Sequence, residues 1–247
     1  MCRPKMLAIV VVFVAAPALA DVTFFTEKSQ FEAFNINDGK VLKGIEDFEE
    51  STIPDLGKLA FPSPLQNGVP NIAFPNGISA TNLIIQDNTL PGPSAPLPQP
   101  SGNPQALFAT GLGFAGSNSK KVGEDMGILA GIHVSTDLIF NPDDGIKTGV
   151  GFDLSRYQGF NMGGTGFVIS VFDISNMLVG VLPIPEPGVE PGKTFFGVWA
   201  DSIGRINIHD NQPNLPEGID NIQMWVPEPG TLSLLLVGGI FALRRRR

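Results

Sequence analysis

Glycine and proline divide this chain into short runs, and this division restricts its fold more than any other feature. The 247 residues include 29 Gly and 22 Pro, and apolar and polar side chains alternate in many of the runs between them. Residues 166–174 alternate strictly, and Leu178–Ile184 follows as a natural hairpin partner. A period of two is typical of strands with one buried face. Roughly ten or more such strands, with almost no helical period, predict an all-β fold, a β-sandwich.

The expected elements can be placed along the chain from these runs and from turn signals such as Pro75-Asn76-Gly77. One short helix, Glu27–Phe34, is expected after an N-cap at Thr26. In the first long strand, Val41, Ile45 and Phe48 are expected to face the core. The expected strands are Val22–Phe25, Lys40–Glu49, Asn71–Phe74, Ile78–Ile85, Ala106–Thr110, Ile128–Val134, Leu138–Phe140, Ile146–Leu154, Gly166–Ile174, Leu178–Ile184, Thr194–Ala200, Arg205–His209 and Ile219–Trp225.

Both ends of the chain carry sorting features. Residues 1–20 have a basic start, an apolar stretch and the small-x-small sequence Ala18-Leu19-Ala20, the pattern of a signal peptide cut by signal peptidase after Sec-translocon export. Residues 226–247 contain Pro227-Glu228-Pro229, then a 13-residue apolar run and four arginines, Arg244, Arg245, Arg246 and Arg247. As a helix the run is ~20 Å long, short against a hydrocarbon core of ~30 Å. The arginines favour the cytoplasmic side, which predicts a marginal single transmembrane helix with residues 21–225 as an exported domain.

The order of tripeptide, apolar helix and arginine cluster resembles the PEP-CTERM sorting signal of Gram-negative bacteria. The resemblance implies that exosortase, a membrane transpeptidase, recognises Pro227, Glu228 and Pro229 and removes the helix and the arginines. It implies a membrane-anchored precursor and then a non-enzymatic protein at the cell surface or in the extracellular polysaccharide layer. The exported domain also resembles the jelly-roll-like domains found with this signal. Cleavage and retention of the anchor both remain open.

Processing at both ends would change the charge of the protein. The full chain carries 16 basic and 24 acidic residues, a net charge of −8. Loss of residues 1–20 and of everything after Pro227 would leave 10 basic and 23 acidic residues, a net charge of −13. Such a surface repels nucleic acid and anionic lipid and attracts cations, including calcium. The only cysteine, Cys2, would also be lost, so no disulfide is expected and the hydrophobic core must supply the stability.

Calcium is the one cofactor that the sequence brings into consideration. Phe48-Glu49 and Ile219-Asp220-Asn221-Ile222 resemble two segments of carbohydrate-binding jelly rolls, which lie together and share a structural calcium ion. The resemblance implies Glu49 and Asp220 as ligands, with carbonyl groups and water completing six to eight oxygens. A first alternative function is therefore a carbohydrate-binding module. Its aromatic platforms for sugar rings, if they are not part of the core, would be Trp199, Trp225 and Tyr157.

A second alternative is a secreted enzyme similar to glycoside hydrolases, which need two carboxylates facing each other across a cleft. The acids available in the first long strand are Glu46, Asp47, Glu49 and Glu50. Spacing along one strand does not show such an arrangement, and solvated acids on an edge strand are the preferred interpretation. The two histidines, His133 and His209, are too few for a typical zinc site. Residues 111–116 match G-x-G-x-x-G, but no helix is expected after them, so a dinucleotide site is not indicated.

Overall fold

The computed structural model describes residues 21–54, 57–88, 107–110, 127–130, 135–156, 167–184, 194–210 and 217–228. Several predictions made from the sequence fall outside these residues: the signal peptide with Ala18 and Ala20, the apolar run, Pro229, Tyr157, His133, the glycine motif and Arg244–Arg247.

Two antiparallel sheets form the domain, which confirms the prediction of a mainly β fold. The first sheet has the order β1 (Val22–Phe25), β12 (Thr194–Ile203), β9 (Lys147–Arg156), β14 (Glu217–Pro227), β7 (Gly127–Ala130), β6 (Leu107–Thr110) and β3 (Lys58–Phe61), and β2 (Lys40–Glu46) also pairs with β14. The second has the order β11 (Leu178–Ile184), β10 (Phe167–Phe172), β13 (Arg205–Asp210), β8 (Ser135–Phe140), β5 (Leu83–Asn88) and β4 (Leu65–Gln66).

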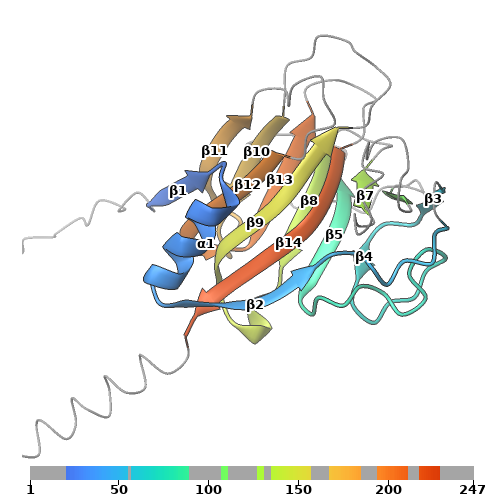
Figure 1. Cartoon of the computed structure of the whole chain (residues 1–247), viewed down its shortest axis with the longest axis horizontal. Coiled ribbons are helices and arrows are strands. Elements are labelled where there is room, and N and C mark those ends of the chain that lie inside the picture. The colour runs from blue at the N-terminus through green and yellow to red at the C-terminus, as the bar shows by residue number, and fades with distance from the viewer. Residues whose placement is uncertain are drawn as a thin grey trace, which may run out of the picture.

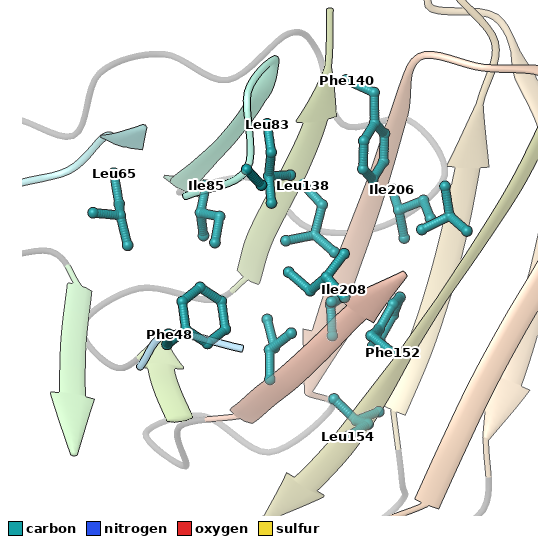
Figure 2. Close-up of a cluster of buried hydrophobic side chains, with 14 of the residues drawn as sticks. Phe48, Leu65, Leu83, Ile85, Leu138, Phe140, Phe152, Leu154, Ile206 and Ile208 are labelled. Atoms are coloured by element: carbon teal, nitrogen blue, oxygen red, sulfur yellow. The ribbon is translucent and has the colours of Figure 1, made fainter. Parts of the chain in front are cut away.

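The two sheets lie face to face, and the alternating side chains meet between them (Figure 1). Phe152 and Leu154 of the first sheet and Leu138, Ile206 and Ile208 of the second point into one buried cluster (Figure 2), each fully shielded from solvent. Fully burying a side chain of this size contributes roughly 1.5–3 kcal/mol relative to leaving it exposed. The apolar member of each alternating pair therefore holds the sheets together, as the period of two predicts.

In the part of the chain that the structure describes, one α-helix, α1 (Lys28–Asn37), covers the outer face of the first sheet (Figure 1). Its central side chain, Phe31, is fully buried and meets the rings of Phe25, Phe195 and Trp225 at centroid distances of 5.6, 5.5 and 6.3 Å. The helix begins one residue later than expected and its N-cap is Glu27, without a side-chain capping bond. The prediction of a Thr26 cap is wrong, because packing of Phe31 on the sheet positions the helix without it.

The first long strand differs from its prediction. Strand β2 ends at Glu46, because Phe48 adopts a left-handed backbone with φ 59° and turns the chain inward. Val41 and Ile45, expected in the core, are 37% and 42% exposed. Strand β2 has β14 as its only partner strand in the described part of the sheet. Its apolar side chains therefore remain at the margin of the domain rather than between the sheets.

The proline-rich stretch between residues 51 and 82 is also more regular than expected. It contains two short strands, β3 and β4, where the local sequence indicates only loop. Residues 71–74, expected as a strand, form a turn in which Asn71 Oδ1 accepts hydrogen bonds from the N–H groups of Ala73 and Phe74. Strand β3 pairs with β6, and strand β4 pairs with β5, in both cases across an intervening segment of the chain. Pairings at such separation leave no periodic signal in a two- to four-residue strand.

Candidate functional site

The last strand is the element that presents the predicted sorting motif, and it is embedded in the domain. Along its length β14 pairs with β9, and its second half also pairs with β2. Ile222 and Met224 project into the core between the sheets, while Trp225 packs beneath α1 on the opposite face. Because side chains on both faces of β14 are buried and its backbone is paired with its neighbours, the C-terminal end of the strand has a defined position on the domain.

Strand β14 ends at the first residue of the predicted sorting motif, Pro227. Pro227, its last residue, has Lys40 as its cross-strand partner, and the N–H of Glu228 donates to the carbonyl oxygen of Gly39 at 3.3 Å. Both Pro227 and Glu228 are exposed, directly after the buried Val226. Proline lacks a backbone N–H and is suited to the end of a strand. The first two residues of the tripeptide therefore stand at the surface, at the point where the sheet ends.

The two predicted calcium ligands lie on neighbouring segments. Strand β2 pairs with β14, so the expectation that the first long strand and the last strand adjoin is confirmed. Asp220 in β14 is 5% exposed, and Glu49 is exposed in the turn that follows β2. Asn221, at φ 51°, donates its side-chain N–H groups to Asp220 at 3.2 Å and to Asp153 of β9 at 3.0 Å. This amide bridges two carboxylates that would otherwise repel each other.

A tighter carboxylate cluster lies where β2 ends. Ligand oxygens of Glu46, Asp47 and Glu50 all lie within 4.8 Å of one another. Glu46 is completely buried, so the interpretation as solvated acids is wrong for this residue, whereas Glu49 is exposed. Glu46 accepts hydrogen bonds from the N–H groups of Phe48 and Ala80 at 2.9 and 2.8 Å and from Ser79 Oγ at 3.1 Å. Oε2 of Glu50 is buried and has no hydrogen-bond partner in the described part of the chain.

Burial shifts the pKa of one member of this cluster, Glu46. Removal from water raises the pKa of Glu46; its bonds to the backbone oppose that effect and the nearby carboxylate of Glu50 adds to it. Oxygen atoms within 4.8 Å are closer than the ~5–5.5 Å that separates the carboxyl groups of retaining glycosidases. The arrangement suits carboxylates that share a proton or a cation better than an acid and a nucleophile on opposite sides of a substrate.

The predicted aromatic platforms have structural partners. Trp225 is 5% exposed, and its ring packs against Phe31. Trp199 is partly exposed, donates its indole N–H to Asp38 at 3.0 Å and packs edge-on against Phe34 at 5.7 Å. These contacts place Trp225 in the core beneath α1 and leave one edge of Trp199 accessible. His209 lies within β13, paired with Val168 and Ser135.

A buried polar network on the outer face of the second sheet was missed by the sequence analysis. Arg205, 2% exposed, forms an ion pair with the fully buried Asp137 at 3.1 Å, and its guanidinium carbon lies 3.8 Å from the centroid of the Phe172 ring. Asp137 also accepts from Asn88 and Asn207. Burial raises the pKa of Asp137, while the charge of Arg205 opposes that effect. The sequence did contain a signal, because polar residues occupy the outward positions of Arg205–Asp210 and two of the three, Ser135 and Asp137, in Ser135–Phe140.

A shallow hollow of about 520 Å³ lies at the edge of the second sheet and offers mainly amide and hydroxyl groups, without a carboxylate or an imidazole among its lining side chains: Gln66, Asn67, Thr81, Asn82, Leu83, Ile84 and Asn141.

The fold and the exposed strand end define a two-sheet β domain whose last strand leads directly into the C-terminal segment. No protein-family model, curated protein or solved structure matches this chain. Within residues 21–228, as far as the structure describes them, no helix has the length and apolar character needed to cross a membrane.

Proposed function

We propose that this protein is an exported, non-enzymatic surface protein whose jelly-roll-like β-sandwich is delivered through a C-terminal PEP-CTERM signal. The observation that carries the proposal is the position of Pro227 and Glu228, exposed where β14 leaves the sheet. A membrane transpeptidase needs an accessible tripeptide close to the bilayer. The residues after Pro229 supply an apolar run and four arginines, the order that orients an anchor with its basic end in the cytoplasm.

In this proposal the precursor passes through the Sec translocon, loses residues 1–20 to signal peptidase and stays in the inner membrane until exosortase acts. The released domain joins the exopolysaccharide layer at the cell surface. Its net charge of −13 after processing keeps it soluble and apart from nucleic acid. A domain of two packed sheets without cysteine suits such a passive, exported role.

The test is the substitution Glu228→Ala in the native host, with Glu27→Ala as a matched control at another exposed glutamate. Glu228→Ala is expected to leave precursor in the inner membrane, where protease added to spheroplasts still digests the domain. Glu27→Ala is expected to be sorted normally, and mass spectrometry of its surface form should find no peptide from residues 232–247. A surface form that retains Arg244–Arg247, or a domain protected from protease in spheroplasts, contradicts the proposal.

A carbohydrate-binding module with structural calcium is the second candidate. It is supported by the pairing of β14, which contains Asp220, with β2, which is followed by Glu49. It is also supported by the three carboxylates of Glu46, Asp47 and Glu50 at the end of β2. Calcium binds carboxylate and carbonyl oxygens in such flexible arrangements. Binding of the purified domain to a glycan array in calcium, with loss of binding in chelator, is the result expected for this function.

A further inference from the structure

The strand directions bring several turns to the end of the domain from which the chain leaves. Strand β14 ends there at Pro227, and because β9 and β2 are antiparallel to it, both begin there. The turn before β9 contacts β14 directly, since a Cβ atom on Gly145 would lie 3.5 Å from Cγ1 of Val226. The C-terminal end of α1 joins the same region, because Gly39 donates its N–H to the carbonyl of Ile36 and accepts the N–H of Glu228.

Four exposed apolar side chains surround this exit, and we call them the exit rim: Ile36, Val41, Leu42 and Ile146, which are 62%, 37%, 42% and 41% exposed. Val41 and Leu42 have Val226 and Trp225 as cross-strand partners. Since neighbouring residues of a strand point to opposite faces, Val41 and Leu42 lie beside β14 on opposite faces of the sheet. Ile36 lies in the last turn of α1, and Ile146 follows Gly145.

The charged side chains around the exit rim nearly cancel one another, unlike those of the domain as a whole. Around it lie three lysines, Lys40, Lys43 and Lys147, and four acids, Asp38, Asp143, Asp144 and Glu228, which sum to −1. Two pairs are joined directly: Lys40 with Asp38 at 3.4 Å, and Lys147 with Asp144. Residues 21–228 carry 10 basic and 24 acidic residues, a net charge of −14, so the rest of the domain carries −13. A lipid surface therefore meets little repulsion at this end.

We propose that the exit rim rests on the bilayer surface while the precursor is anchored, which rests on the proposed function of the C-terminal segment. Three residues lie between Glu228, bonded to Gly39, and Leu232, and the four fully extended steps of this chain reach at most ~14 Å. The interfacial layer of one leaflet is itself ~5–8 Å thick. Once the apolar run has inserted, the exit lies at most ~6–9 Å beyond the headgroup layer, close enough for the rim to rest on it.

The shortness of the apolar run draws the domain further toward the membrane. A run of 13 residues is short for the hydrocarbon core, and a short span is accommodated by thinning the bilayer or drawing its flanking residues into the interface. Apolar side chains at the rim gain by leaving water in that position. The docking would also hold Pro227 and Glu228 at the membrane surface, where a transpeptidase embedded in the bilayer acts.

The test uses the full-length chain with Cys2→Ser, reconstituted in phosphatidylcholine vesicles. Leu42→Cys and Ile146→Cys would each carry an environment-sensitive fluorophore, and Ile72→Cys and Val181→Cys, 66% and 38% exposed on loops and strands of the second sheet, are the matched controls. Three measurements are needed: flotation with the vesicles, quenching by aqueous iodide and quenching by nitroxide-labelled lipid. The labels at positions 42 and 146 should show several-fold weaker iodide quenching than the controls, together with strong lipid quenching.

Each other outcome is decisive. A chain that does not float with the vesicles overturns the anchoring on which the inference rests. A chain that floats, with positions 42 and 146 as open to iodide as position 72, overturns the docking alone. Labels shielded from both iodide and lipid nitroxide would mean that the apolar run or another protein copy covers the rim, which also overturns it. The variant Leu42→Asp should restore iodide quenching at position 146, whereas Val181→Asp should not.

Discussion

The N–H of Glu228 donates to the carbonyl oxygen of Gly39 at 3.3 Å, so the last described residue of the chain is bonded to the turn between α1 and β2. The backbone of Gly39 is left-handed, with φ 66°, a conformation that glycine adopts at little cost. One turn near the start of the domain thus fixes where the chain leaves it. The candidate sorting motif is coupled to the folding of the whole first sheet rather than attached through a loose linker.

The packing of Phe31 makes a prediction about Gly197. A Cβ atom there would lie 2.7 Å from Cδ2 of the Phe31 ring, which has no room to move between Trp225 and Phe195. We expect Gly197→Ala to lower the free energy of unfolding by roughly 1–3 kcal/mol, as overpacking of a core does. Urea denaturation measures the effect.

The matched control for this prediction is Gly44→Ala, since a Cβ atom on Gly44 would meet its nearest neighbour, Met224 Cε, at 4.0 Å. Gly44→Ala should leave the stability unchanged or raise it slightly, because alanine has fewer unfolded conformations to lose. Equal destabilisation by the two substitutions would show that the contact with Phe31 is not the cause.

Removing only one partner of the buried ion pair between Arg205 and Asp137 should strongly reduce the stability of the domain. Arg205→Met leaves the carboxylate of Asp137 fully buried without its cation, and such a change typically costs about 3–5 kcal/mol. Lys40→Met breaks the more exposed pair with Asp38 and should cost at most about 1 kcal/mol. Thermal and urea unfolding of both variants test the contrast. Similar small losses in both would contradict the role assigned to Arg205.

The raised pKa of Glu46 predicts a pH dependence of stability. Because burial favours the protonated carboxyl in the folded protein, its contribution to stability is fully present below the ordinary pKa of 4.5 and is lost as the pH rises through the raised folded pKa. Asp137, whose pKa burial also raises, adds a change of the same sign above its ordinary value of 3.8. Removing the neighbouring charge with Glu50→Gln should therefore reduce the loss.

The measurement is urea denaturation at a series of pH values on both sides of pH 4.5. The exposed control Glu27→Gln should retain the slope of the unmodified protein, while Glu50→Gln flattens it. An identical slope in the Glu50→Gln variant would mean that the two carboxylates do not interact.

Calcium should raise the melting temperature of the folded protein. A ligand that binds only the folded state stabilises it by about 2.7 kcal/mol at a hundredfold excess over Kd. We expect a melting temperature several degrees higher in millimolar calcium than in chelator, and Asp220→Ala should abolish the difference. If Glu50→Gln abolishes it while Asp220→Ala does not, the ion is held by Glu46, Asp47 and Glu50 rather than by Glu49 and Asp220. Equal melting temperatures in both buffers would reject a calcium site.

The strands of the second half of the domain could be predicted because their alternation is local. In β10, Phe167, Ile169 and Val171 face the core as their period of two indicates. Strand β2 shows the limit of the same reasoning, since Val41 and Ile45 were expected on one buried face, but the register with β14 shifts between them and both remain exposed. A period of two identifies a strand with two different faces, but it does not say whether a second sheet covers either of them.

The candidate sites also differ in whether they could be recognised from the sequence or only from the tertiary structure. The order of tripeptide, apolar run and arginines is a property of the sequence alone, because length, hydrophobicity and charge decide the behaviour of a segment at a membrane whatever the domain before it. The adjacency of the first long strand and the last strand was expected from the resemblance to carbohydrate-binding jelly rolls, but the burial of Glu46 beneath Ser79 and Ala80 and the ion pair of Arg205 with Asp137, 68 residues apart, came only from the tertiary structure. Contacts between distant segments depend on register and burial, and neither is written in the local spacing of residues.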